Sequence, residues 1–256
     1  IISLNKGIQS KDKKNLKNNK DKIKNSIKNS KDKNFNKLLS KYLKGKKVSV
    51  VGVSVGSQGN AKKINKFDIV VKFNFFTKKY YSDLNTQSDR CDISYFSDYF
   101  LKNKKKLILN SKNQIKYFVF KFNKSNDYSL LPKKETSISN VYDDLILGTP
   151  SLLINTLFDL IRYYPSEIKV FNSTLYYPIN NKIRNLNTKK YRKINFETKY
   201  SVFSIVKSFA IHDIITEYII VRNLFILKLI KVDNQLERIL NLGLQKYLSK
   251  MEKYYK

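Results

Sequence analysis

The feature that most restricts the fold of this chain is the repeated alternation of short β-branched runs with helical patterns. The run Lys47–Val51 ends at Gly52, which is typical of a buried strand that meets a turn. Similar strand patterns follow at 68–73, 92–96, 106–109, 115–122 and 167–171. Strands that alternate with helices favour a parallel sheet with crossover helices. The sequence therefore predicts a Rossmann-like, mostly parallel α/β sheet flanked by helices in a single domain.

Four further segments are expected to be helices. Apolar side chains recur at helical spacing in residues 36–44, 150–164, 214–230 and 233–247. The polar stretch 173–210 lacks a clear period. Long connections of this kind are often lids or substrate loops.

The N-terminal part differs in composition from the rest of the chain. Residues 1–47 hold 16 Lys and 3 Asp, which gives +13 of the net charge of +31. We expect residues 1–35 to be a disordered or stem segment, because they have too few apolar side chains to form a core. Residues 36–256 are expected to form the folded domain. Because the sequence starts with Ile rather than Met, an earlier segment or anchor has to be considered.

The positive charge leaves two interpretations open. The net charge of +18 outside residues 1–47 (31 minus 13) is spread along the chain. This favours the interpretation that the charge serves general solubility and forms no dedicated binding patch. Attraction to an anionic surface or substrate is the alternative. A basic nucleic-acid-binding protein is thus a candidate from another class. Against it, Phe35 and Tyr42 are the only aromatic residues in the basic segment, and no RNA-binding signature is present.

Single copies of two residue types limit the chemistry. Cys91 is the only cysteine, which excludes an intrachain disulfide and a cysteine-rich metal site. His212 is the only histidine, so we expect no histidine-based metal site. No apolar run of about 18 residues is present, and we expect no membrane-spanning helix.

Two polar features follow predicted strands. Gly52, Gly56 and Gly59 lie in the turn after the first strand, where backbone N–H groups can bind a phosphate. The pattern is neither the dinucleotide fingerprint nor a P-loop, and a turn without ligand is the alternative. Asn74 ends the next strand and offers an amide at the edge where ligands collect. It is otherwise a simple turn former.

Two helix starts carry the remaining candidates. Thr149 and Ser151 lead into a predicted helix whose N-terminus favours a carboxylate or phosphate, unless Thr149 is only its cap. His212 precedes another helix, with Asp213 as a candidate cap and Glu217 in the first turn. An imidazole that titrates near neutrality suits proton abstraction. A histidine without function is the alternative.

At these segments the chain resembles the sialyltransferases that carry large, small and very small sialylmotifs. The large motif is similar to residues 48–54 and 64–74, and the small motif to residues 149–153 and 167–171. The very small motif, His followed five positions later by Glu, matches His212 and Glu217. Residues 88–96 are also similar to the segment after the large motif. The order of these motifs, over about 48–230, carries the resemblance.

The chain departs from the family pattern at several positions. Val53 stands where the family has a donor-binding Asn, and Ser151 where it has a Gly. Asn65 replaces an Asp and Lys72 an Arg. With a single cysteine, the disulfide of animal members cannot form. These departures favour a divergent microbial or viral relative.

The resemblance implies a GT-A-like variant of the fold and an inverting transfer of sialic acid from CMP-sialic acid. His212 would take the proton of the acceptor hydroxyl. Gly52, Ser54 and Asn74 would hold the nucleotide and its phosphate. Thr149 and Ser151 would lie near the ribose or carboxylate of the donor, with Glu217 also counted among the donor-binding residues.

The resemblance also sets expectations about partners and location. The acceptor would be a glycan or glycolipid, no metal or other cofactor would be needed, and no specific nucleic acid would bind. A microbial protein would be cytoplasmic or peripheral to a membrane, because acidic headgroups attract lysines. A eukaryotic one would be in the Golgi. A transferase of the same fold for another nucleotide sugar, or a member without catalysis, stays open.

Overall fold

The computed structural model shows one α/β domain built on a seven-stranded sheet. It describes residues 37–54, 57, 59–75, 88–97, 108, 114–121, 136–139, 151–177 and 213–255. The expected N-terminal segment 1–35 lies outside them. The predicted Rossmann-like α/β fold is confirmed.

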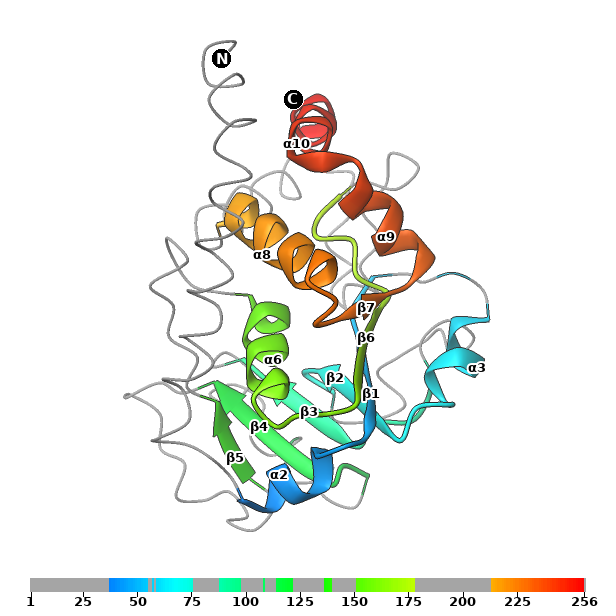
Figure 1. Cartoon of the computed structure of the whole chain (residues 1–256), viewed down its shortest axis with the longest axis vertical. Coiled ribbons are helices and arrows are strands. Elements are labelled where there is room, and N and C mark those ends of the chain that lie inside the picture. Colours follow the sequence, from blue (N-terminus) through cyan, green and yellow to red (C-terminus); the bar gives the residue numbers. More distant parts are fainter. Residues whose placement is uncertain are drawn as a thin grey trace.

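All neighbouring strands in the sheet are parallel, in the order β5-β4-β3-β2-β1-β6-β7 (Figure 1). β2 is buried throughout, as expected for a parallel strand that is covered on both faces of the sheet. Such strands have nearly continuous apolar sequences. The strand bounds are β1 Lys47–Val51, β2 Ile69–Phe73, β3 Ile93–Phe96, β4 Tyr117–Lys121, β5 Thr136–Ser139, β6 Glu167–Phe171 and β7 Lys231–Val232.

The strand order reverses beside β1. The chain moves outward from β1 through β2 to β5, and then returns to place β6 on the other side of β1. Val50 of β1 is therefore paired with both Val71 and Val170. In open parallel sheets, ligands bind outside the carboxyl ends of the strands at such a reversal. The fold thus directs attention to the residues that follow β1 and β6.

Helices cover both faces of the sheet. Figure 1 shows α6 and α8 on one side of β1 and β6, and α3 on the other. The core on the α6 side also includes side chains of α2, α9 and α10. On the other face, Ile64 of α3 packs with Val51, Val70 and Phe171. The helix bounds are α2 Lys37–Leu43, α3 Asn60–Ile64, α6 Leu152–Ile161, α8 Ile214–Ile226, α9 Asn234–Asn241 and α10 Gly243–Tyr255.

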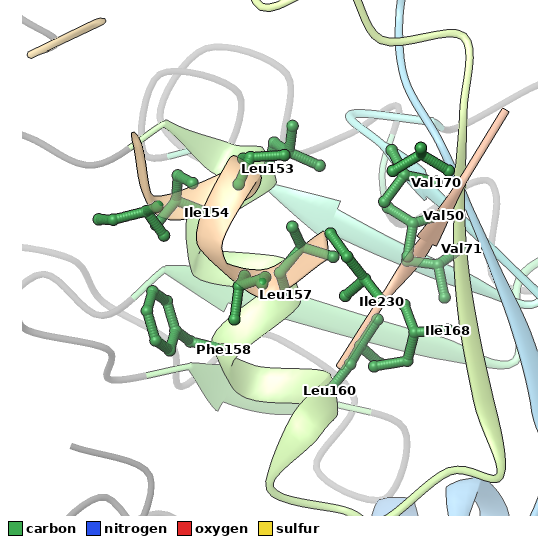
Figure 2. Packing of buried hydrophobic residues seen from close by; sticks show 14 of the residues in the cluster. Val50, Val71, Leu153, Ile154, Leu157, Phe158, Leu160, Ile168, Val170 and Ile230 are labelled. Carbon is green, nitrogen blue, oxygen red and sulfur yellow. The ribbon is translucent and has the colours of Figure 1, made fainter. Parts of the chain in front are cut away.

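The helix α6 is the central covering element. Leu153, Leu157 and Leu160 recur at helical spacing and are buried in the same cluster as Val50 and Val170 of the sheet (Figure 2). Burying a side chain of this size stabilises the fold by roughly 1.5–3 kcal/mol. The predicted helix is therefore confirmed, and it is buried on every side over residues 153–160.

A buried ion pair accompanies this apolar packing. Asp159 of α6 and Arg162, the C-cap of the helix, contact each other, and their side chains are at most 1% exposed. Tyr95 of β3 donates its hydroxyl to Asp159 at 2.6 Å. Burial, together with the nearby Asp159, raises the pKa of Tyr95 well above its usual value, so this phenol stays a donor. The pair links α6 to β3 inside the core.

The structure contains elements that the sequence patterns did not predict. The short helix α3 follows the glycine turn, and β5 and β7 extend the sheet at its two ends. The predicted strand at 106–109 lies outside the described residues except for Ile108, which is helical. The predicted helix 233–247 is two helices, because Gly243 has a positive φ of 75° where α10 begins.

The predicted helix 214–230 ends earlier, at Ile226. Lys228 adopts a left-handed φ of 58°, and the N–H of Leu229 donates to the carbonyl of Leu224 at 3.0 Å. This is a Schellman C-cap, a position that usually holds glycine. Because lysine occupies it here, the end of α8 could not be recognised from the sequence. Every helix among the described residues is too short or too polar to cross a bilayer.

Candidate functional site

The turn after β1 is bound tightly to the end of β6. The N–H of Gly52 donates to the carbonyl of Phe171 at 2.7 Å, and the N–H of Ser54 donates to the carbonyl of Asn172 at 3.0 Å. A Cβ atom at Gly52 would lie 2.4 Å from the Asn172 carbonyl oxygen, so only glycine fits there. These two N–H groups donate to the last residue of β6 and to the residue after it, so they are not directed at a ligand. The Ser54 hydroxyl is the polar side-chain group at this junction.

A hydroxyl pair lies above this junction. The side-chain oxygens of Ser54 and Thr174 are 3.3 Å apart, although the residues are 120 positions apart in the chain. Ser173 and Thr174 are each 9% exposed, so they lie at the border between core and surface. Hydroxyl groups both donate and accept, which suits the oxygen atoms of a ribose, a sugar or a phosphodiester.

The segment after β6 has an unusual backbone. Asn172, Leu175 and Tyr176 have positive φ angles of 54°, 47° and 63°. Asparagine adopts this conformation readily, whereas for leucine and tyrosine it costs about 1–2 kcal/mol each. Such strain persists where the surrounding structure fixes it, and it concentrates at functional sites. Residues 173–177 begin the polar stretch that the sequence suggested as a lid or substrate loop, but none of them was named as a site residue. The polar triplet Asn172-Ser173-Thr174 directly after a buried strand was a usable signal.

A buried polar network supports the junction from below. Asn60, at the start of α3, donates to the side chains of Asn172 at 2.7 Å and Asp233 at 3.2 Å. Asp233 also accepts the backbone N–H of Asn172 at 2.9 Å and caps α9 by accepting the N–H of Leu236 at 2.9 Å. All three polar residues are at most 5% exposed. The network therefore joins the start of α3 to the ends of β6 and β7 and to the start of α9.

Asn74 lies after β2, as the sequence predicts. Its φ is 50°, its N–H donates to the carbonyl of Tyr95 at 2.7 Å, and its side-chain oxygen accepts the N–H of Ser97 at 3.0 Å. Within the described part of the chain, no residue pairs with the amide nitrogen of its side chain. An amide nitrogen at this position suits donation to a ligand at the carboxyl edge of the sheet.

Two further predicted residues, Ser151 and Glu217, contact each other. The N–H of Ser151, the cap of α6, donates to the Glu217 carboxylate at 2.5 Å, and the Ser151 hydroxyl contributes a second hydrogen bond. Glu217 lies in the first turn of α8 and is 2% exposed. Burial raises the pKa of Glu217 from 4.5 to about 7. The group at the N-terminus of α6 is thus a carboxyl of the protein itself.

Tyr176, in the segment after β6, interacts electrostatically with Glu217. Burial, and secondarily the charge of Glu217, raise the pKa of its phenol well above the usual range. Thr174, in the same short segment, contacts Ser54, so residues 172–177 interact both with the turn after β1 and with Glu217 of α8. Asp213 caps α8 by accepting the N–H of Thr216 at 3.0 Å.

Thr149 and His212 lie outside the described residues, as does the middle of the glycine turn around Gly56. Each borders a described site residue in the sequence: Thr149 is two positions before Ser151, and His212 directly precedes Asp213. Among the described residues, no group of three or more His, Cys, Asp or Glu side chains is arranged as a metal site.

Two departures from the family pattern meet on the α3 side of the sheet. Lys72 of β2 is 1% exposed and donates to the carbonyl of Ser88 at 2.7 Å, and the Ser88 hydroxyl donates to Asn65 at 2.5 Å. Burial raises the pKa of the neighbouring Cys91 thiol to about 12, which keeps it protonated and unreactive. These hydrogen bonds join β2 to Ser88 and to Asn65, the C-cap of α3.

The geometry can be set beside the comparisons with known proteins. No protein-family model matches this chain, and no curated protein matches it.

Proposed function

We propose that the protein is an inverting glycosyltransferase that moves sialic acid from CMP-sialic acid to a sugar hydroxyl of a glycan or glycolipid. The observations that support this most are two contacts between distant segments. Ser54 contacts Thr174 beside the strand-order reversal, and Ser151 contacts Glu217. Ser54, Ser151 and Glu217 lie in the segments that carry the sialylmotif resemblance, and Thr174 follows one of them.

The proposed reaction needs a base and a set of fixed hydrogen-bond donors. His212 would take the proton of the acceptor hydroxyl while the hydroxyl oxygen attacks the anomeric carbon. The bond from that carbon to the CMP phosphate breaks, and the electron pair leaves with CMP. Uncharged donors such as Ser54 and Asn74 would hold the nucleotide and its phosphate, since preorganised dipoles can stabilise developing charge. Thr149 and Ser151 would lie near the donor's ribose or carboxylate.

A second candidate is supported by Val53. This side chain stands where the resemblance calls for a donor-binding Asn, and it packs against the hydrophobic core. Without that amide, a transferase specific for another nucleotide sugar, or a protein that binds a nucleotide without catalysis, would fit the same architecture.

Thermal denaturation in the presence of ligands tests both candidates. We expect CMP and CMP-sialic acid to raise the melting temperature, because a ligand that binds only the folded state stabilises it. Stabilisation by UDP or GDP in place of CMP would favour the second candidate. Stabilisation by oligonucleotides alone, lost at higher salt, would contradict both and favour a nucleic-acid-binding protein.

A further inference from the structure

The contact between Ser151 and Glu217 joins two helices at their starts. Ser151 caps α6 by accepting the N–H of Ile154 at 3.5 Å, and the same residue holds the Glu217 carboxylate through its own N–H and hydroxyl. Glu217 is one turn into α8 and 2% exposed. One buried carboxyl group thus joins the start of α8 to the start of α6, beside the apolar packing that the two helices share.

The groups around Glu217 act on its proton in opposite directions. Burial is the largest influence and favours the protonated form, and Asp213 at the cap of α8 adds to it. The hydrogen bonds from Ser151 and the charge of Lys121, at the end of β4, favour the ionised form. The phenol of Tyr176, after β6, also lies close enough to interact electrostatically with the carboxyl. The protonation state of the carboxyl therefore depends on groups at the starts of α6 and α8, at the end of β4 and after β6.

We propose that Glu217 is a positioning residue whose buried carboxyl acts as a proton-dependent latch between the starts of α6 and α8. Separation of the helices would move the carboxyl from its buried site into water, where it ionises more easily. Linkage then requires that the proton favours the closed arrangement and that ionisation favours separation. Acidification tightens the latch, and a rise of pH towards neutrality loosens it.

The latch has a consequence for the donor site, and this part rests on the proposed function. In the sequence, Thr149 lies two positions before Ser151, and His212 lies five positions before Glu217. The latch joins the helices that follow these two residues. Its closure would set the spacing between the proposed base and the proposed donor-binding segment.

Hydrogen–deuterium exchange of the full chain tests the latch without any ligand. Protection of the Ser151 and Ile154 amides, corrected for their intrinsic exchange rates, is followed from pH 5 to pH 8. In the wild type we expect opening to become more frequent with rising pH, by up to about tenfold per pH unit, and to level off above about pH 7. The Leu236 amide at the cap of α9 provides the internal reference.

Glu217→Gln keeps the shape of the side chain and removes its charge, so protection of the same amides should lose its pH dependence. Glu237→Gln is the matched control, because Glu237 occupies the first turn of α9 but is exposed. It should behave as the wild type. The latch is overturned if wild-type protection relative to Leu236 does not change with pH, or if Glu217→Gln titrates like the wild type.

Titration with CMP separates the latch from its consequence. We expect CMP affinity to fall at least tenfold in Glu217→Ala and to be restored in Glu217→Gln. Should Glu217→Ala fail to fold, the same test is made by measuring CMP affinity at several pH values. We expect the affinity to vary with pH in the wild type and to stay constant in Glu217→Gln. The expected exchange pattern without CMP binding would support the latch and contradict the proposed function. Equal CMP affinity in all variants would overturn the link between them.

Discussion

Gly52 and Asn172 approach each other so closely that a Cβ atom on Gly52 would lie 2.4 Å from the Asn172 carbonyl oxygen. The contact is between two backbones, and neither can move without disturbing β1 or β6. We therefore expect Gly52→Ala to lower the free energy of unfolding by about 1–3 kcal/mol, the usual cost of overpacking. Urea denaturation measures this change.

Gly45→Ala is a suitable comparison for Gly52→Ala. A Cβ atom at Gly45 would meet no heavy atom within 4 Å, but its φ is +72°. The cost should therefore come from the backbone alone, about 1–2 kcal/mol. If the two variants behaved alike and each lost only about 1 kcal/mol, the contact with Asn172 would not be the reason for glycine at position 52.

Asp233 supports three elements at once, and its removal should affect all of them. Asp233→Ala leaves α9 without its cap and takes away the acceptor for Asn172 and Asn60. We expect a loss of about 2–4 kcal/mol, the sum of a cap and of buried donors left unpaired. Asp213→Ala, which removes the cap of α8, should cost only about 1 kcal/mol in the same denaturation experiment. Equal losses would mean that the network adds nothing to the cap.

The pH dependence of stability should carry the signature of Glu217. The pKa of this group is about 7 in the folded protein and 4.5 for the unperturbed side chain. A raised pKa contributes stability that is complete below about pH 4.5 and is lost as pH rises to about 7. The difference of about 2.5 units corresponds to about 3 kcal/mol, as an order of magnitude.

The measurement for Glu217 is the unfolding free energy of the wild type and of Glu217→Gln at matched pH values. Other carboxyl groups titrate in both proteins, so only the difference between the two reports on Glu217. We expect the variant to gain on the wild type between pH 4.5 and pH 7. A difference that stays constant over this range would show that the carboxyl is not buried as described.

The ion pair of α6 predicts a non-additive effect. Arg162→Met removes the cation beside a fully buried Asp159, and should cost about 3–5 kcal/mol. The double variant Asp159→Leu, Arg162→Met removes both charges and should be more stable than the single one. Thermal denaturation of both variants checks the order. The opposite order would mean that Asp159 does not depend on Arg162.

His212→Ala tests the proposed base. General base assistance contributes roughly 10²–10⁴ in rate, so transfer from CMP-sialic acid should fall by about that factor. The melting temperature and its increase with CMP should remain close to those of the wild type, because the imidazole is proposed to act on the acceptor and not on the nucleotide. A variant with near-normal turnover would remove His212 from the mechanism.

The main elements of the fold could be predicted because their signals are local. The β-branched run before Gly52 and the leucine spacing of α6 report burial directly. The two-residue strand β7 is too short to give a pattern, and Lys228 hides the end of α8 by occupying a position that usually holds glycine. These features depend on neighbours that are distant in the sequence.

The site shows the same limit. Ser151 and Glu217 were each recognised as candidates, but their contact joins positions 66 residues apart and left no trace in the sequence. The network of Asn60, Asn172 and Asp233 was missed for the same reason. Each of these residues has an ordinary local role as a helix start or strand end, and only the tertiary fold brings them together.

The reversal of strand order beside β1 has a consequence for how the chain acquires its structure. On one side of β1, Ser49 contacts Ile69 of β2, which is 20 positions later in the chain. On the other side β1 pairs with β6, and the residues that meet there are about 120 positions apart, as Ser54 and Thr174 are. During synthesis, one edge of β1 therefore has no partner strand until most of the polypeptide has been made. Contacts of such long range form slowly, and bare edges invite wrong partners. Early, half-assembled forms of this protein should depend on chaperones more than a helical protein of equal length would.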